Sequence, residues 1–453
     1  MTETLVPRPS FPARALRPAV SRPGSRAGLA ASAAAASPAA GLTTARGAAL
    51  YIGALLGPGL LLLPGLAAAE AGPASVLAWA GLLVLSGLFA IVFGSLGRAF
   101  PSAGGVIGYV RAGLGARASA VAGWSFLAGV VAGAPVVCLI GAGYVTELTG
   151  GGRLARALIG TGLLLAVMAL AAGGLRASAS AQLLLVGLLL VVVIVAVAGS
   201  AGASHAANWT PFAPHGWGAI GPAASTLMLS FVGWEAVAPL TTRFTDPARQ
   251  LPRVIGIALA VTSVLYLALA VATISVLGTG AGISAPLAAL LRAAAGPAGT
   301  AAAAVAAVVL TLGAVNAYVT GAAEMAAELT RPGRARPGAD AGSRPAPRLL
   351  AAIALAGLVL ISLYGLGLAS PAALVAIPTT LFLVVYLGCM TSAVRVLRGP
   401  ARLAAVPAAV IVAAVLGYSG WALLAPLAVA AVVFAARPLG AAVHAVRTMR
   451  TVR

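Results

Sequence analysis

Apolar runs of roughly 20 residues, the length of a helix that crosses the hydrocarbon core of a bilayer, recur along almost the whole chain. Arginines, prolines and glycine-rich joints separate the runs. Their number predicts an all-α integral membrane protein with about twelve transmembrane helices. The approximate limits of the runs are 47–69, 74–96, 120–146, 154–173, 179–200, 219–241, 254–277, 299–325, 349–368, 371–394, 403–417 and 419–436.

The composition excludes most soluble fold classes. Charged residues make up 8% of the 453 positions, whereas a soluble globular protein has about 25%, so the chain cannot cover a water-exposed surface. Cys138 and Cys389 are the only cysteines, which rules out a disulfide scaffold. A net charge of +20 is typical of nucleic-acid-binding proteins. Here the basic residues, all arginine, lie between the apolar runs, so membrane topology explains them and no nucleic-acid partner is expected.

The arginines also predict the orientation, because loops rich in arginine stay on the cytoplasmic side of a membrane. With twelve spans and a cytoplasmic N-terminus, 25 of the 28 arginines fall in cytoplasmic segments. Only Arg153, Arg156 and Arg292 fall outside. One missed span would reverse every later loop. The asymmetry therefore favours a multi-pass protein of the plasma membrane with both termini in the cytoplasm.

The first predicted span contains an irregular segment near its middle, where Gly57 and Gly59 flank Pro58 and Pro64 follows. Pro58 removes a helical hydrogen bond and clashes with the preceding turn, and the glycines make unwinding easier. Irregular backbone at that depth is tolerated only where it lines a cavity. A simple proline kink, or a small-residue packing face, is the alternative interpretation.

The sixth predicted span carries a matching irregularity at 230–235, Ser-Phe-Val-Gly-Trp-Glu, with Pro239 one turn later. Gly233 can loosen the helix, and Glu235 is the one acidic residue well inside a predicted span. A carboxylate there costs about 2.5–3.5 kcal/mol on insertion scales, so it needs a partner, a cavity or a proton. The alternative interpretation is a protonated Glu235 that only holds neighbouring helices together.

Two spans broken at mid-depth, five helices apart, are the pattern of a secondary transporter built from inverted repeats. The second half-helix of each broken span exposes unpaired N–H groups and the positive end of its dipole. Such a terminus binds a carboxylate without a cationic side chain. No basic residue that could bind the carboxylate instead lies well inside a predicted span.

Weaker signals lie in span eight and in the histidines. Asn316 and Tyr318 either face a cavity or pack against neighbouring helices. Glu324 and Glu328 are expected to pair with Arg331 or Arg334 rather than to act in coupling. An intramembrane metal cluster is excluded because every histidine lies outside the predicted spans, at His205, His215 and His444.

Taken in order, these segments resemble the amino acid–polyamine–organocation transporter superfamily over roughly residues 47–402. Within it, Asn316-Ala317-Tyr318 is similar to the exporters of methionine and branched-chain amino acids. The matching elements are Gly57-Pro58-Gly59 with Pro64, Ala71-Gly72-Pro73, the 100–105 loop with Tyr109 and Gly115, the 231–235 segment, and Asp246-Pro247-Ala248-Arg249 with Pro252-Arg253.

The resemblance implies ten core helices in two inverted repeats of five, two peripheral helices, and transport by alternating access. The segment around Gly57 would offer main-chain groups to the carboxylate of an amino acid, and the segment around Phe231 would lie by its ammonium and side chain. Apart from the resemblance, the position of Glu235 well inside a span makes it the predicted H⁺-coupling residue. No catalytic residue, cofactor or metal is implied. The implied substrate-binding residues are Gly57, Pro58, Gly59, Leu60, Ser230, Phe231, Gly233 and Trp234.

The predicted function is secondary transport of neutral, aliphatic or methionine-like amino acids, by export or by proton-coupled antiport. Apolar residues around Gly57 and Phe231 argue against arginine or a polyamine as substrate. An importer of the same fold remains an alternative, and so does a membrane sensor or scaffold that transports nothing. A membrane-embedded protease is disfavoured, because the spans lack the histidine or the pair of aspartates that it needs.

The chain divides into four predicted segments. Residues 1–44 form a disordered basic cytoplasmic tail, whose arginines could also bind anionic lipid at about 1 kcal/mol per charge. Residues 45–396 form the transporter core and 397–438 the two peripheral spans. Residues 439–453 form the cytoplasmic C-terminal tail. The oligomeric state is left open.

Overall fold

The computed structural model describes residues 42–100, 105–174, 179–236, 244, 246–282, 285–330 and 345–435. The chain divides into a unit over 1–41 and a unit over 42–453, and the described residues all belong to the second unit. Nearly all of the predicted N-terminal tail, the predicted C-terminal tail, the 331–344 loop with Arg331 and Arg334, and Pro239 lie outside the described residues.

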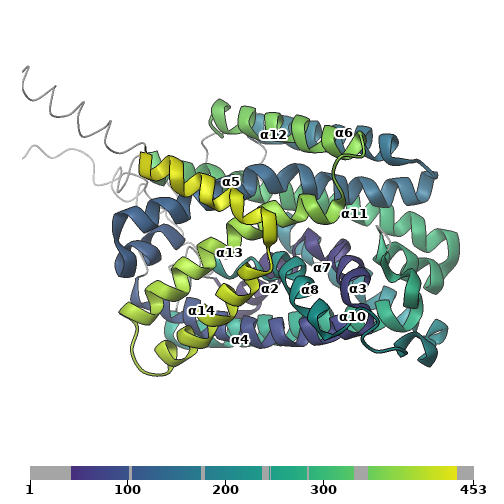
Figure 1. The fold of residues 1–453 in the computed structure, drawn as a ribbon, viewed down its shortest axis with the longest axis horizontal. Coiled ribbons are helices and arrows are strands. Elements are labelled where there is room, and N and C mark those ends of the chain that lie inside the picture. Colours follow the sequence, from purple (N-terminus) through teal and green to yellow (C-terminus); the bar gives the residue numbers. More distant parts are fainter. Residues whose placement is uncertain are drawn as a thin grey trace, which may run out of the picture. The chain divides into compact units, whose positions relative to one another are not determined.

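The described residues fold almost entirely into helices, and none of them belongs to a β-strand (Figure 1). A single parallel bridge joins Leu42 to Phe244. The α-helices are α2 (Thr44–Leu55), α3 (Leu63–Ala71), α4 (Ser75–Ala99), α5 (Val106–Thr149), α6 (Arg153–Ala172), α7 (Ala179–Gly199), α8 (Ile220–Leu227), α10 (Pro247–Ala272), α11 (Pro286–Thr330), α12 (Pro347–Gly365), α13 (Pro371–Val396) and α14 (Pro400–Gly417). A shorter apolar helix over Gly420–Ala435 follows α14.

Eight helical stretches among the described residues are long and apolar enough to cross a bilayer. Their outward faces carry large apolar side chains, such as Leu158 on α6 (65% exposed), Leu358 on α12 (68%) and Leu403 on α14 (74%). A protein in water rarely exposes apolar faces of this extent, whereas lipid solvates them. The prediction of a helical, multi-pass membrane protein is therefore confirmed, and the count of twelve helices stays a prediction.

Capping residues set the start of several helices. The hydroxyl of Ser370 accepts a hydrogen bond from the amide of Ala373 (3.2 Å), and Pro371 takes the first position of α13. Asp246 caps α10 in the same way, with Pro247 next in the chain. Proline suits this position because the first amides of a helix have no partner within it. The Asp-Pro pair of the sequence is thus a helix start.

The interior is built around α5, which packs against both α11 and α13, while α6 and α12 cover its other side (Figure 1). Small residues permit the close approach. A Cβ at Gly141 on α5 would clash with the hydroxyl of Thr311 on α11, and one at Gly129 would lie 3.1 Å from the ring of Phe382 on α13. Membrane helices rely on such close backbone packing, because lipid provides no hydrophobic drive for association.

Two helices run beyond the predicted spans. The prediction placed the third span at 120–146 and the eighth at 299–325, whereas α5 begins at Val106 and α11 at Pro286. Gly115 (φ 81°) interrupts α5, and Gly296 (φ 60°) interrupts α11. Glycine adopts positive φ without steric cost, so the chain turns there and joins a short preceding helix to the long one.

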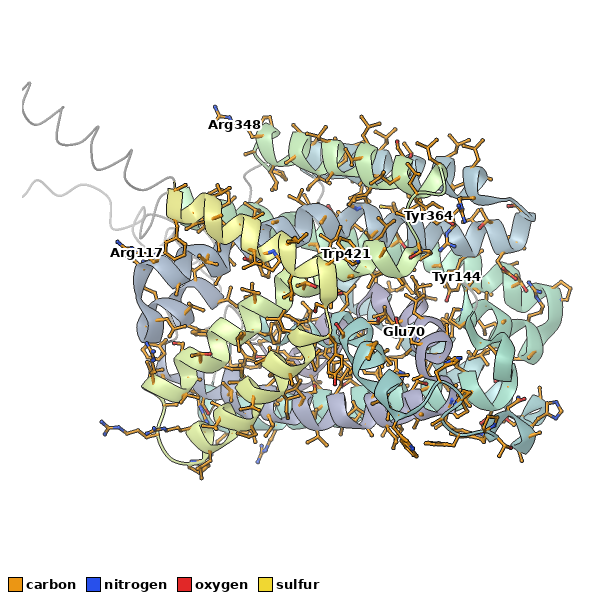
Figure 2. The ribbon with its side chains drawn as sticks, viewed as in Figure 1. Glu70, Arg117, Tyr144, Arg348, Tyr364 and Trp421 are labelled. Atoms are coloured by element: carbon orange, nitrogen blue, oxygen red, sulfur yellow. The ribbon has the colours of Figure 1, made fainter. Side chains whose placement is uncertain are left out.

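The arginines at the start of α5 and α12 lie at the same end of the helices. Figure 2 shows Arg117 and Arg348 toward that end and Tyr144 and Tyr364 toward the other. This placement agrees with the predicted sidedness, in which both arginines belong to cytoplasmic segments. The orientation itself stays a prediction.

Candidate functional site

The first predicted break is confirmed. The helix α2 ends at Leu55, Gly57 is extended (φ −71°, ψ 174°), a 3₁₀ turn η1 spans Pro58–Leu61, and α3 begins at Leu63. The amide of Gly57 makes no hydrogen bond within the described part of the chain. The amide of Gly59 lies in the first turn of η1, where the amides have no carbonyl partner within the turn. The break therefore presents open main-chain donors.

The sixth predicted span is also interrupted, as its sequence indicates. The helix α8 ends at Leu227, and a 3₁₀ turn η6 covers Met228–Phe231. Val232 is extended, and Gly233 has φ 145°, a conformation that favours glycine. A further short turn, η7, covers Trp234–Ala236. Both broken spans thus contain several residues of non-helical backbone.

The two breaks touch each other through their main chains. A Cβ at Gly233 would overlap the carbonyl oxygen of Ala54, in the last turn of α2. A Cβ at Gly59 would lie 3.2 Å from the hydroxyl oxygen of Ser230. Glycine is needed at 233 both for its φ angle and for this approach. The prediction that the two irregular segments belong to one site is consistent with this contact.

Tyr266 on α10 joins the two breaks. Its hydroxyl donates to the carbonyl oxygen of Leu55 (2.6 Å) and to that of Ser230 (2.7 Å). The ring is buried against Trp79 and Phe231. The two carbonyls belong to interrupted helices, so a single side chain supplies the donor that regular helix would otherwise provide.

Tyr386 on α13 holds the second break from the other side. Its hydroxyl oxygen accepts from the amides of Gly233 (2.9 Å) and Trp234 (3.1 Å) and donates to the Glu235 carboxylate. The carboxylate also accepts from the amide of Gly233 (2.9 Å). Glu235 therefore has the partner that its depth in the span required, and that partner is a neutral hydroxyl.

Two further side chains anchor the broken spans. Tyr144 on α5 donates to the carbonyl oxygen of Leu61 (2.6 Å), at the end of η1. Glu70 on α3 accepts from the hydroxyl of Thr226 on α8 (2.7 Å), so the second half of one broken span is bonded to the first half of the other. Figure 2 marks Tyr144 and Glu70.

A cavity lies against the breaks. Its walls come from η1, η6, α5, α11 and α13, and apart from the hydroxyl of Tyr318 they are apolar side chains and glycines. A Cβ at Gly57 would lie 3.6 Å from that hydroxyl. The lining residues are Gly57, Gly59, Gly129, Val130, Gly133, Ala134, Val136, Val137, Leu229, Tyr318, Pro378 and Phe382.

The structure places the implied binding residues in two groups. Gly57 and Gly59 line the cavity, Pro58 stands between them, and Ser230 adjoins Gly59 with a buried hydroxyl that has no hydrogen-bond partner among the described residues. Gly233 lies against α2 and does not line the cavity. The side chains of Leu60, Phe231 and Trp234 are buried outside the lining, and the indole of Trp234 donates to Ser86 on α4 (2.9 Å).

Sequence reasoning missed the three anchoring tyrosines. Tyr144, Tyr266 and Tyr386 lie in predicted spans, and a buried phenol hydroxyl needs a partner, so each was a recognisable polar signal. The partners could not be read from the sequence, because Tyr266 and Leu55 are 211 positions apart. Of the two residues left open in span eight, Tyr318 lines the cavity and Asn316 is buried.

The comparisons with known proteins cover most of the chain. The family profile described as amino acid permease matches residues 42–444. The uncharacterized amino acid permease YecA of Bacillus subtilis (strain 168) is 32% identical over 370 residues, which are 80% of this chain and 87% of that protein.

Two other relatives match over shorter stretches. The L-methionine/branched-chain amino acid exporter YjeH of Escherichia coli (strain K12) is 36% identical over 203 residues, 44% of this chain and 48% of that protein. The branched-chain amino acid permease BcaP of Bacillus subtilis is 33% identical over 94 residues, 19% of each protein.

Proposed function

Because the chain belongs to the amino acid permease family of the amino acid–polyamine–organocation superfamily, we propose that it is a secondary active transporter of neutral amino acids. The family is one of transporters rather than enzymes. The observation that carries the proposal is the cavity at the paired breaks, which offers open amides at one end and apolar walls elsewhere.

The amides of Gly57 and Gly59 are the proposed binding site of the substrate carboxylate. Main-chain N–H groups ahead of a helical turn carry partial positive charge, and they bind an anion without the desolvation cost of a buried cation. The unpartnered hydroxyl of Ser230 lies beside them and would accept from the ammonium. Phe231, Gly233 and Trp234 act by fixing the shape of the second break.

The substrate class follows from the remaining walls. Val130, Val137, Leu229 and Phe382 offer an apolar surface, and among the described lining residues none carries a charge. A cationic side chain such as that of arginine would lose its hydration there without compensation. Leucine, isoleucine, valine and methionine fit this chemistry. The substrates in the names of the relatives YjeH, an exporter, and BcaP, a branched-chain amino acid permease, agree with it.

We propose twelve transmembrane helices, with ten forming two inverted repeats of five and residues 397–438 forming two peripheral spans. In this arrangement the breaks lie at the repeat interface, and alternating access moves helices around a fixed site. The protein lies in the plasma membrane with both termini cytoplasmic, and lipid surrounds its apolar faces. Glu235 is the proposed H⁺-coupling residue, and export or antiport is the favoured direction.

Counterflow in proteoliposomes tests the function. Labelled leucine or methionine should accumulate transiently in liposomes preloaded with the same unlabelled amino acid. Gly57→Leu should abolish this signal, because its side chain would enter the cavity and cover the open amides. The matched control is Gly187→Leu, since Gly187 on α7 is exposed and has no heavy atom within 4 Å of its Cβ position.

The outcome separates the alternatives. No counterflow from the wild-type protein would favour a sensor or scaffold. Counterflow that survives in Gly57→Leu would place the substrate elsewhere. An importer would show the same counterflow as an exporter, so the direction requires transport in cells, where an exporter lowers the internal concentration of labelled leucine and an importer raises it.

A further inference from the structure

The turn between α13 and α14 carries three exposed arginines. Arg395 lies in the last turn of α13, Arg398 in the connection, and Arg402 in the first turn of α14. Gly399, with φ 60°, forms the turn, and its carbonyl oxygen accepts from the amide of Arg402 (3.1 Å). Three positive charges therefore lie within eight positions of a tight connection between packed helices.

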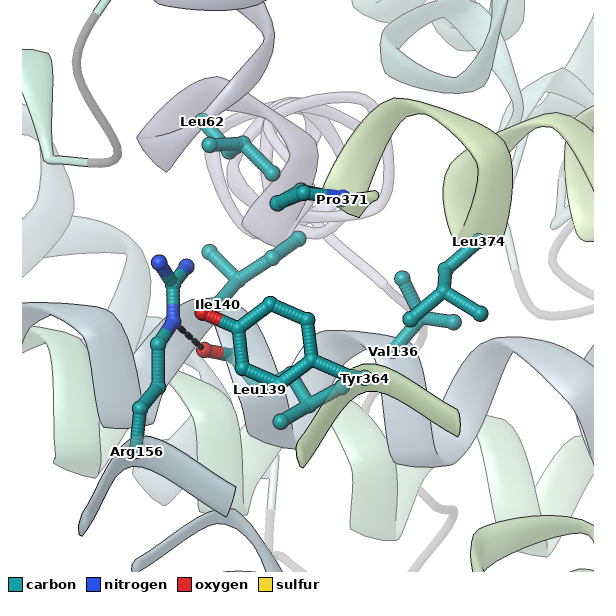
Figure 3. A pocket seen from close by; sticks show the side chains of 8 residues that line it. All are labelled: Leu62, Val136, Leu139, Ile140, Arg156, Tyr364, Pro371 and Leu374. Carbon is teal, nitrogen blue, oxygen red and sulfur yellow. Dashed lines mark hydrogen bonds between the residues drawn. The ribbon is translucent and has the colours of Figure 1, made fainter. Parts of the chain in front are cut away.

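Some other arginines are held by protein groups. The arginine count of the sequence placed Arg156 in an outer segment, but it lies in the first turn of α6 and is 6% exposed. Its Nε donates to the carbonyl oxygen of Leu139 (3.0 Å), and its guanidinium carbon lies 5.5 Å from the ring centre of Tyr364 (Figure 3). Arg292 pairs with Glu147 (2.8 Å). In these cases the chain itself occupies the guanidinium.

The arginines of the α13–α14 turn lack such partners. Arg395 donates once, to the carbonyl oxygen of Gly113 (3.3 Å). Within the described part of the chain, Arg398 and Arg402 make no ion pair and no side-chain hydrogen bond. The three guanidinium groups therefore keep most of their donors free for an anion from outside the chain.

The neighbouring helices offer no counter-ion either. No aspartate or glutamate follows Asp340 in the sequence, so α13 and α14 contain no acidic side chain. The helices α4 and α8, which also pack against α14, contain none. The positive charge at the turn is therefore not neutralised by any of the helices that surround it.

An apolar surface adjoins these charges along α14. Leu403, Val406 and Val410 share a helix face with Arg402 and are 74%, 45% and 63% exposed. The exposed face continues to Ala413, about 17 Å from Arg402 along the axis at 1.5 Å per residue. That length is close to one leaflet of a hydrocarbon core about 30 Å thick. The surface therefore has a basic end and an apolar length.

We propose that Arg395, Arg398 and Arg402 bind the phosphate of an anionic phospholipid, whose acyl chains lie along the exposed face of α14. The planar guanidinium fork suits phosphate, because it forms two parallel charge-assisted hydrogen bonds. A free phosphate would occupy only the basic end, whereas a phospholipid occupies both parts of the surface. The site lies apart from the central cavity, so it goes beyond the proposed function and does not depend on it.

Native mass spectrometry of the purified full-length protein, titrated in detergent with phosphatidylglycerol or phosphatidylcholine, tests the proposal. The wild-type protein should bind phosphatidylglycerol more tightly. The double variant Arg398→Gln/Arg402→Gln should weaken this binding roughly thirtyfold, because each arginine near an anionic lipid surface contributes about fivefold. Binding of phosphatidylcholine, whose headgroup carries no net charge, should stay unchanged.

The matched control removes the same charge elsewhere. Arg117 and Arg348 are exposed at the same end of the helices and lie outside the α13–α14 turn (Figure 2). Arg117→Gln/Arg348→Gln should bind phosphatidylglycerol as the wild-type protein does. Equal weakening in the two double variants would mean that net charge alone attracts the lipid, and it would overturn the site.

A soluble competitor separates a lipid from a free phosphate. Excess glycerol phosphate should leave phosphatidylglycerol bound, since it has no acyl chains to occupy the face of α14. Complete displacement would assign the arginines to a soluble phosphate and overturn the lipid site. If Arg398→Gln/Arg402→Gln does not fold, the wild-type protein decides, because equal affinity for the two lipids would also overturn the proposal.

Discussion

Three tyrosine hydroxyls supply hydrogen bonds to the backbone of the interrupted spans. Tyr144, Tyr266 and Tyr386 come from three different helices, and each bonds main-chain atoms of η1, α2 or the 228–236 segment. In a bilayer no water is available to bond an unpaired backbone group, so irregular backbone is unstable there unless side chains bond it. Each of the three hydroxyls therefore stabilises the irregular backbone against a return to regular helix.

Tyr266→Phe should therefore destabilise the fold. The change leaves the carbonyls of Leu55 and Ser230 without their common donor, and an unsatisfied buried polar group costs about 1–3 kcal/mol. The thermal midpoint of the purified protein in detergent is expected to fall. Tyr418→Phe is the control, because Tyr418 is 56% exposed. An equal fall in both variants would remove the special role of Tyr266.

Glu235→Gln should separate coupling from exchange. Glutamine can still accept from Tyr386 but cannot release a proton, so pH-driven accumulation of leucine should be lost while equilibrium exchange is retained. Both fluxes are measured side by side in liposomes. Glu324→Gln, at an exposed position on α11, should leave both unchanged. Full pH-driven flux in Glu235→Gln would reduce this residue to a bonding partner of Tyr386.

The sequence predicted the location of each break but not its surroundings. Proline between two glycines, and glycine beside a carboxylate, are local signals, and the structure has both interruptions at those residues. Phe231 and Trp234 resisted prediction because an aromatic side chain in an apolar span serves equally as lining or as core. In the structure they pack toward α10 and α4, so contacts with helices distant in sequence decide that both side chains belong to the core.

Helix contacts depend on certain glycines, and the sequence alone does not show which glycines lie at an interface and which face outward. Gly141 on α5 and Gly162 on α6 look alike in sequence, each in an apolar run. The structure distinguishes them, since Gly141 faces Thr311 on α11 and Gly162 faces open space. Similarly, Gly115 and Gly296 extend α5 and α11 beyond their predicted limits by turning the chain, and apolar run length carries no information on this.

Gly141→Ala should destabilise the protein, because the added methyl group overlaps Thr311 in a packed helix interface. Overpacking of this kind costs about 1–3 kcal/mol. Gly162→Ala carries the same change on the exposed side of α6 and should have little effect. The fraction of protein that stays monodisperse after heating measures both. Equal behaviour of the two variants would contradict the assigned interface.

The whole molecule has an arginine asymmetry that predicts its sidedness. Reporter fusions after Arg344 and after Ala203 should give opposite signals, cytoplasmic and outer respectively, because three predicted spans, 219–241, 254–277 and 299–325, separate the two positions. The reporter at Arg344 tests the loop that the structure leaves undescribed. Equal signals would overturn the twelve-span topology.

The hydroxyl of Tyr266 has one hydrogen atom for two carbonyls. While the broken spans stay together, the hydroxyl can donate to both carbonyls. Once they separate, it can donate to only one, and the other carbonyl loses its donor in a medium that offers no replacement. The carbonyls of Leu55 and Ser230 therefore compete for one donor, and a motion that separates the two spans would cost one of them its hydrogen bond, about 1–3 kcal/mol for a carbonyl left unsatisfied.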